Sequence, residues 1–100
     1  NMQEKLKKHV LTLLGTEKIH PLQEAILDET LEDCIKQGFH LLEEDEKNRN
    51  ILISFNARLK VMEGTIKGLM LSDADTITIN YRNQTFVLDK KEAIVIQALK

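Results

Sequence analysis

The spacing of apolar residues changes near the middle of this chain, and that change constrains the fold more than any other feature. Leu6 and Val10 begin a stripe with helical intervals, and a similar stripe continues through the acidic segment that follows. From about residue 50, apolar and polar residues alternate as they do in half-buried β-strands. A chain of 100 residues has the length of one domain. We therefore predict a single α+β domain over residues 1–100, helical at 1–47 and five-stranded at 48–100.

Two residues indicate helix boundaries in the first half of the chain. Gly15 follows the first stripe at the position where a left-handed C-cap is common, so we expect the first helix to end there. Pro21 suits the first position of a second helix, because its missing N–H would have no helical partner anyway. Asp28 could cap a fresh helical start. The sequence therefore leaves open whether residues 21–44 form one bent helix or two.

Five short strands with tight connections are expected in the second half. The second of them contains Gly64 and Gly68, which inside a strand indicate a sharp bend. The expected strands are residues 51–55, 59–71, 76–81, 85–88 and 93–99, with a hairpin loop at Arg82-Asn83-Gln84. An antiparallel meander of this kind predicts a small, strongly bent β-barrel.

Acidic and basic residues are separated along the chain, although the formal net charge is only −2. Residues 1–20 carry +2, residues 21–47 carry −7 and residues 48–100 carry +3. Such a separation bears on partners rather than on fold. The expected second helix is thus acidic and the expected strands are basic, so the two halves could attract each other or bind separate partners.

No combination of residues indicates an enzyme, a metal site or a cofactor. The residues that could act as soft metal ligands are His9, His20, Cys34 and His40. Their spacing in the sequence matches no metal-binding motif. Neither Ser54 nor Ser72 has a nearby histidine or lies in a nucleophile elbow. Asp73 and Asp75 lie in a segment that reads as a solvated turn and lacks the ligand pattern of a calcium loop. We expect a protein without enzymatic activity.

Two further features bear on location. No apolar run approaches the ~20 residues that a membrane span needs. The single cysteine, Cys34, excludes an internal disulfide, which fits a reducing compartment. We expect a cytoplasmic protein that does not enter a membrane.

The stretch from Leu59 to Ile79 resembles the first motif of the Sm/LSm fold. It has a glycine in the bent strand (Gly64), a spaced apolar pattern, an aspartate near the turn and then an apolar strand. The asparagine of the family's turn is replaced by Asp75-Thr76, and the family's second motif is replaced by the stretch from Leu88 to Glu92. Since these are the residues by which Sm rings hold RNA bases, the resemblance implies the Sm-like barrel more than its RNA binding.

A second resemblance covers the chain from Ile26 to Leu99. An acidic helix at Leu27–Ile35, ahead of a short β-unit, is similar to the YolD-like family of Gram-positive bacteria and their phages. Members of that family are small, Sm-like, without known enzymatic activity, and associated with translesion DNA polymerases and the DNA-damage response. The resemblance implies a non-enzymatic adaptor that binds a DNA polymerase or a repair protein.

The charged residues suggest where such partners would bind. For the adaptor we predict an acidic helical face and a basic strand face, formed by Glu29, Glu32, Asp33, Glu43, Glu44, Arg58, Lys60 and Lys67, with Arg82 on the basic side. The alternative function is an Sm-like nucleic-acid binder that contacts RNA or single-stranded DNA through Tyr81, Arg82, Lys90 and Lys91. The nearly continuous apolar stretch Ala93–Leu99 would allow a homo-oligomer if it lies at an open sheet edge.

Overall fold

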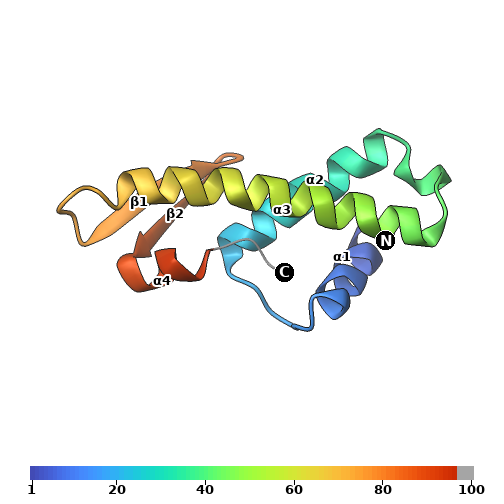
Figure 1. Ribbon diagram of the computed structural model, residues 1–100, viewed down its shortest axis with the longest axis horizontal. Coiled ribbons are helices and arrows are strands. Elements are labelled where there is room, and N and C mark those ends of the chain that lie inside the picture. Colours follow the sequence, from blue (N-terminus) through green and yellow to red (C-terminus); the bar gives the residue numbers. More distant parts are fainter. Residues whose placement is uncertain (97–100) are drawn as a thin grey trace.

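The computed structural model, which describes residues 1–96, is built along one long helix (Figure 1). This helix, α3, runs from Glu44 to Leu69 and is ~39 Å long at 1.5 Å per residue, in a molecule whose longest extent is 48 Å. The other elements, in chain order, are α1 (Met2–Leu13), α2 (Pro21–Lys36), the 3-10 helix η1 (Phe39–Leu41), β1 (Thr76–Tyr81), β2 (Gln84–Asp89) and α4 (Lys90–Val95). Helices α2 and α3 pack side by side, with α1 near one end of α3 and the strands near the other.

The five-stranded Sm-like barrel predicted for residues 48–100 is wrong. Two of its expected strands, 51–55 and 59–71, fall in helix α3 and the turn that follows it. The buried side chains of α3 recur three or four residues apart, and they are Ile51, Phe55, Leu59, Met62 and Ile66. Ile53 and Val61 lie between them and are 66% and 72% exposed. These exposed apolar residues produced the apparent alternation, which the helical spacing of the buried side chains overrides.

The two glycines that predicted a bent strand lie inside α3 instead. Both Gly64 and Gly68 are exposed, and a β-carbon added to either would meet nothing within 4 Å. The expected bend is therefore also wrong, because an exposed helical position tolerates glycine at only a modest cost in free energy.

The two helix boundaries predicted in the first half are confirmed. Helix α1 ends at Leu13, and Gly15 follows with a φ of +74°. Helix α2 begins at Pro21, and the ring of His20 caps it by accepting the N–H of Leu22. Helix α2 continues through Asp28 without a break and ends at Lys36, so the segment 21–44 forms one α-helix followed by the short helix η1.

The hairpin predicted around residue 82 is confirmed. Strands β1 and β2 pair antiparallel, with Ile77 opposite Leu88 and Ile79 opposite Phe86. Arg82 and Asn83 form the two-residue turn with φ values of +51° and +64°, the left-handed pair that a type I′ turn requires. Within residues 1–96 these two strands form the only sheet, which is open rather than closed into a barrel.

The strand expected at Ala93–Leu99 is wrong where the structure describes it. Ala93, Ile94 and Val95 belong to α4, which Asp89 caps by accepting the N–H of Glu92 at 2.7 Å. Residues 97–99 lie outside the described part of the chain. The side-chain cap from Asp89, the last residue of β2, thus turns the chain into a helix where apolar content alone suggested a strand.

One hydrophobic core joins all of these elements. Its buried side chains come from α1, α2, η1, α3, both strands, α4 and the residue after α4, and include Val10, Leu31, Phe39, Phe55, Ile77, Leu88 and Ile96. Within residues 1–96 the helices and the strands therefore share one core, rather than each part having a core of its own. No helix in this range is both long enough and apolar enough to cross a membrane.

Candidate functional site

Helix α2 carries the acidic residues that define the candidate site. Most of its circumference is buried against the core, including Leu22, Ile26 and Leu27. The sector that remains carries two rows of carboxylates. Glu24, Asp28 and Glu32 are spaced by four residues and form one row, while Glu29 and Asp33 form the other. The two rows have different surroundings.

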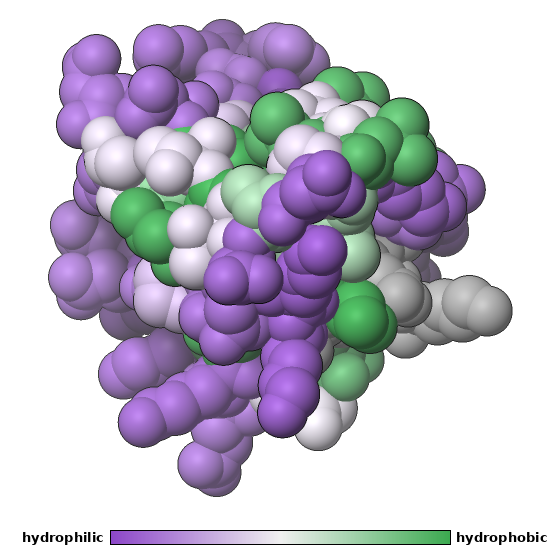
Figure 2. Space-filling model, turned by 90° about the vertical axis from the view of Figure 1, so that its left-hand side faces the viewer, coloured by the Kyte–Doolittle hydropathy of each residue, from purple (hydrophilic) through white to green (hydrophobic). Residues whose placement is uncertain are grey.

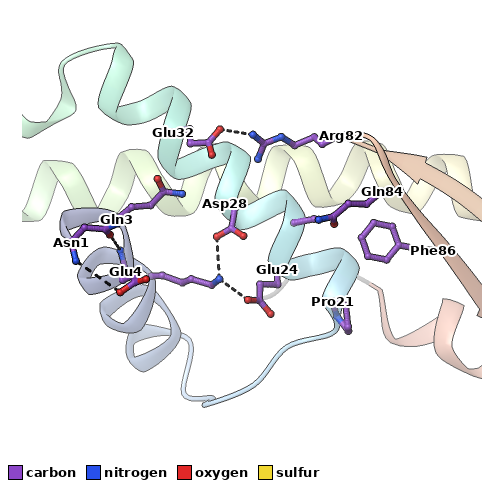
Figure 3. Close-up of a pocket in the computed structure, with 12 residues that line it drawn as sticks. Asn1, Gln3, Glu4, Pro21, Glu24, Asp28, Glu32, Arg82, Gln84 and Phe86 are labelled. Carbon is purple, nitrogen blue, oxygen red and sulfur yellow. Dashed lines mark hydrogen bonds and ion pairs between the residues drawn. The ribbon is translucent and has the colours of Figure 1, made fainter.

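The first row faces a groove between α1, α2 and the hairpin, with a cavity volume of about 660 Å³ (Figure 3). Four of its lining residues are acidic and two are basic, so the lining has an excess of negative charge. The lining residues are Asn1, Gln3, Glu4, Lys7, Pro21, Glu24, Ala25, Asp28, Glu32, Arg82, Gln84 and Phe86. The ring of Phe86 and the ring of Pro21 stand at the hairpin end of the groove, which is its apolar end.

Lys7 crosses the groove from α1 to the first row of carboxylates. Its Nζ lies 2.6 Å from Oε1 of Glu24 and 3.1 Å from Oδ1 of Asp28 (Figure 3). Burial lowers the pKa of Lys7, but the hydrogen bonds and charges of the two carboxylates outweigh it and raise that pKa above its usual value. Lys7 is therefore positively charged, and it partly neutralises the acidic row.

The second row of carboxylates is bound by basic residues of α3 and of the hairpin. Arg58 Nη2 lies 2.5 Å from Asp33 Oδ2, and Arg58 Nε lies 3.4 Å from Glu29 Oε1. The hydroxyl of Tyr81 donates a hydrogen bond to Glu29. Arg82, at the hairpin tip, joins this row to the first, because its Nη2 contacts Glu32 Oε2 at 2.5 Å while its Nε lies 3.9 Å from Glu29 Oε2.

This network uses six of the residues predicted as binding residues, Arg58 among them, and it pairs them with one another. Glu29, Glu32 and Asp33, predicted to bind a partner, contact Arg58 and the hairpin. Tyr81 and Arg82, predicted to contact nucleic acid, bond to carboxylates of α2. The acidic helix thus neutralises basic residues of the second half of the chain within the molecule, which is one of the two outcomes that the charge separation allowed.

The remaining predicted residues lie on other surfaces. Glu43 precedes α3, and Glu44 in its first turn pairs with Lys47 at 3.2 Å. Lys60 and Lys67 are exposed along the outer side of α3, where Lys67 pairs with Glu63 at 3.0 Å. Lys90 and Lys91 form the exposed first turn of α4. Within residues 1–96, no ion pair joins any of these residues to the network around Glu29.

Sequence reasoning missed the residues that make the groove. Lys7 and Glu24 were counted only as charges, and Phe86 and Pro21 only as strand and helix positions. The spacing of Glu24, Asp28 and Glu32 by four residues was the available signal, since it predicts a single row on a helix. What the sequence did not show was that α1 and the hairpin stand on either side of that row.

The described part of the chain shows no arrangement typical of a metal site. Among residues 1–96, no three histidine, cysteine, aspartate or glutamate side chains converge as metal ligands. Cys34 and Ser54 line a smaller cavity of about 180 Å³ near Phe39. Burial raises the pKa of the Cys34 thiol, and the hydrogen bond with Ser54 and the charge of Arg58 offset this only in part. The thiol is therefore less reactive than a free cysteine.

Comparison of the chain with protein-family models, with curated proteins and with solved structures finds no match.

Proposed function

We propose that this protein is a non-enzymatic adaptor that binds a basic, extended segment of a partner protein in the groove between α1, α2 and the hairpin. The observation that carries the proposal is the row formed by Glu24, Asp28 and Glu32. Each of these carboxylates directs one oxygen to Lys7 or Arg82. The other oxygen of each forms no hydrogen bond or ion pair within the described residues, so it can accept from a ligand.

The spacing of this row fits alternate residues of an extended peptide. Four residues of a helix rise ~6 Å, and two residues of a strand advance ~6.8 Å. Lysine or arginine at every second position of a bound segment could therefore reach successive carboxylates. The rings of Phe86 and Pro21 provide a contact for an apolar side chain at one end of that segment.

The same arrangement disfavours the alternative, a nucleic-acid binder. Arg82 and Tyr81 bond to Glu32 and Glu29, and the surrounding carboxylates would repel phosphates. Lys90 and Lys91 alone would neutralise few phosphates, and affinity for nucleic acid grows with that number.

A link to a translesion polymerase or to another DNA-damage protein stays a prediction. The resemblance that suggested it included a barrel that this fold does not contain. The acidic groove supports a basic protein segment as the ligand and does not depend on the identity of that partner.

Fluorescence anisotropy with labelled peptides tests the groove. We expect a peptide with alternating lysines and one aromatic residue to bind, and to bind more weakly as salt is added. A peptide with glutamate in place of each lysine should not bind. Tighter binding of the acidic peptide, or of single-stranded DNA, would contradict the proposal.

A matched pair of variants locates the binding site. Glu24→Gln removes an exposed groove charge and should weaken the peptide about threefold, because an exposed ion pair contributes up to ~1 kcal/mol. Glu44→Gln removes an exposed charge from α3 outside the groove and should leave the affinity unchanged. Equal effects of the two changes would place the peptide elsewhere.

A further inference from the structure

The outer edge of strand β1 has backbone groups that pair with nothing in the described structure. Tyr81 and Gln84 flank a two-residue turn, so they exchange ladder hydrogen bonds, as does every second pair along the hairpin. The residues between them direct their N–H and C=O groups away from β2, and in β1 these are Thr76, Thr78 and Asn80. Within residues 1–96, no hydrogen bond from another segment reaches these backbone groups, and all three side chains are exposed.

The two edges of this sheet differ in how they are protected. At the end of β2, the N–H of Asp89 donates to Glu92 of α4 at 3.4 Å, and α4 packs on that strand. Asp89 also places a charge on the β2 edge. Strand β1 has the sequence Thr-Ile-Thr-Ile-Asn-Tyr, with no charge, no proline and no bulge. Natural sheets use such features to prevent pairing with another strand, and β1 has none of them.

We propose that β1 pairs with β1 of a second copy of this chain, antiparallel and centred on Thr78. In this register, Thr78 faces Thr78 of the second copy, and Thr76 faces its Asn80. About six backbone hydrogen bonds would form, and the sheet would become four-stranded in the order β2, β1, β1 of the second copy, β2 of the second copy. The buried face of each hairpin stays on the same side of the sheet, because residues directly opposite share a face.

Charge supports a second copy in this orientation. Asp73 and Asp75 precede β1, and Arg82 follows it. An antiparallel pair brings the acidic end of each strand beside the Arg82 end of the other, whereas a parallel pair would bring like charges together. Arg82 contacts Glu32 and Glu29 through Nη2 and Nε, and its Nη1 forms no hydrogen bond within the described residues. That nitrogen can donate to Asp75 of the second copy.

The sequence of β1 favours itself as a partner over a charged peptide. A strand without charge meets no like charge when it pairs with its own copy. Four strands satisfy the row of backbone polar groups that the two-stranded sheet leaves open at the β1 edge. We thus propose an oligomer through β1 in place of the one expected through Ala93–Leu99, since Ala93–Val95 belong to helix α4. Strand β1 lies at the end of the molecule that Figure 2 shows, where uncharged and apolar residues lie among hydrophilic ones.

Disulfide trapping tests the register. In Thr78→Cys the two new thiols would face each other across the two-fold axis, at the ~5.5 Å Cα separation of a hydrogen-bonded pair, which a disulfide can span. In Thr76→Cys the same thiols would lie about 14 Å apart, four residues along the strands. Under mild oxidation we expect a covalent dimer from Thr78→Cys and none from Thr76→Cys. The native Cys34 is buried and should not interfere. Cross-linking of both variants to the same extent, or of neither, would overturn the proposal.

Light scattering tests the dimer without cross-links. The unaltered chain should show a doubling of mass as its concentration rises, and Thr78→Lys should stay monomeric because two lysines would meet at the axis. Val87→Lys is the matched control, since Val87 lies directly opposite Thr78 on β2 and is 60% exposed on the same face. It should dimerise like the unaltered chain. A monomer at every concentration, or loss of the dimer in Val87→Lys, would contradict pairing through β1. Thr78→Lys should still bind the basic peptide, so failure of one proposal is distinguishable from failure of the other.

Discussion

Tyr81 connects the hairpin to helix α2 through a single hydroxyl. The side chain is half-buried, and its hydroxyl donates to Glu29. Burial disfavours the phenolate, and the hydrogen bond to Glu29 and the negative charge of Glu29 favour the phenol further. Together they raise the pKa of Tyr81 above its usual 10.0, although Arg58 and Arg82 oppose the shift. Because the chain has one tyrosine and no tryptophan, its near-ultraviolet absorbance reports on this contact directly.

The raised pKa predicts how stability depends on alkaline pH. The folded protein keeps the phenol proton at pH values where the unfolded chain has lost it. The stabilisation is therefore complete below about pH 10, the unfolded value, and is lost as pH rises through the folded value. We expect the tyrosinate absorbance of the folded protein to appear above pH 10 and to shift to lower pH in Glu29→Gln. Glu44→Gln should leave it in place. A native titration midpoint at the ordinary value would contradict the contact.

Single residues that act locally could be predicted from the sequence. Gly15 and Pro21 determine helix ends through backbone geometry that depends on few neighbours. The destination of a charged side chain could not be predicted in this way. Arg58 was expected on a basic face of the second half that binds a partner, yet it contacts Asp33, 25 residues earlier in the chain. The sequence shows both charged residues, but it does not show that the fold brings their side chains into contact.

At the scale of elements, α3 shows why the period of apolar residues was misread. A strand and a helix both accommodate Ile51 and Phe55 as buried residues, since four positions are two strand repeats and about one helical turn. The exposed Ile53 decided in favour of a strand in the sequence, whereas packing against α2 decided in favour of a helix in the structure. A short apolar window is ambiguous for this reason.

Glycine replacement distinguishes the helix from the predicted bent strand. Gly64→Ala should raise the free energy of unfolding by about 0.5–1 kcal/mol, because alanine loses less backbone entropy in a helix and its β-carbon has open space. Gly38→Ala should lower it by about 1 kcal/mol, since Gly38 has a φ of +83°. Urea unfolding followed by circular dichroism measures both. Destabilisation by Gly64→Ala would indicate a bend or a close contact at that position.

At the scale of the whole molecule, the hairpin and the helices share one core and one ion-pair network. Ile77 and Leu88 of the sheet are buried in the same cluster as Ile26 of α2 and Phe55 of α3. Arg82 adds its contact with Glu32, 50 residues away in sequence. Because the helices and both strands contribute side chains to this core, none of them can unfold without exposing part of it.

We therefore expect one cooperative unfolding transition. Tyrosine fluorescence reports on the hairpin, and far-ultraviolet circular dichroism reports on the helices. In urea the two signals should have the same midpoint. Arg82→Ala serves as the comparison, because it removes the hairpin's ion pairs and leaves the shared core in place. It should lower both midpoints together. A tyrosine transition that precedes the loss of helix in the native chain would show that the hairpin is a separate unit.

The amino-acid sequence by itself determined the features that depend on neighbours within a few residues. These are the ends of α1 and α2 next to Gly15 and Pro21, the strands on either side of Arg82-Asn83, and the row of carboxylates on α2. Only the tertiary structure decided that residues 44–69 form a helix, that Arg58 and Arg82 neutralise carboxylates of α2 from two directions, and that a groove opens beside Glu24. The reason is physical: turn and cap geometry is fixed by local backbone sterics. Which side of a segment is buried, and which charges meet, depends on contacts between residues 25 to 52 positions apart.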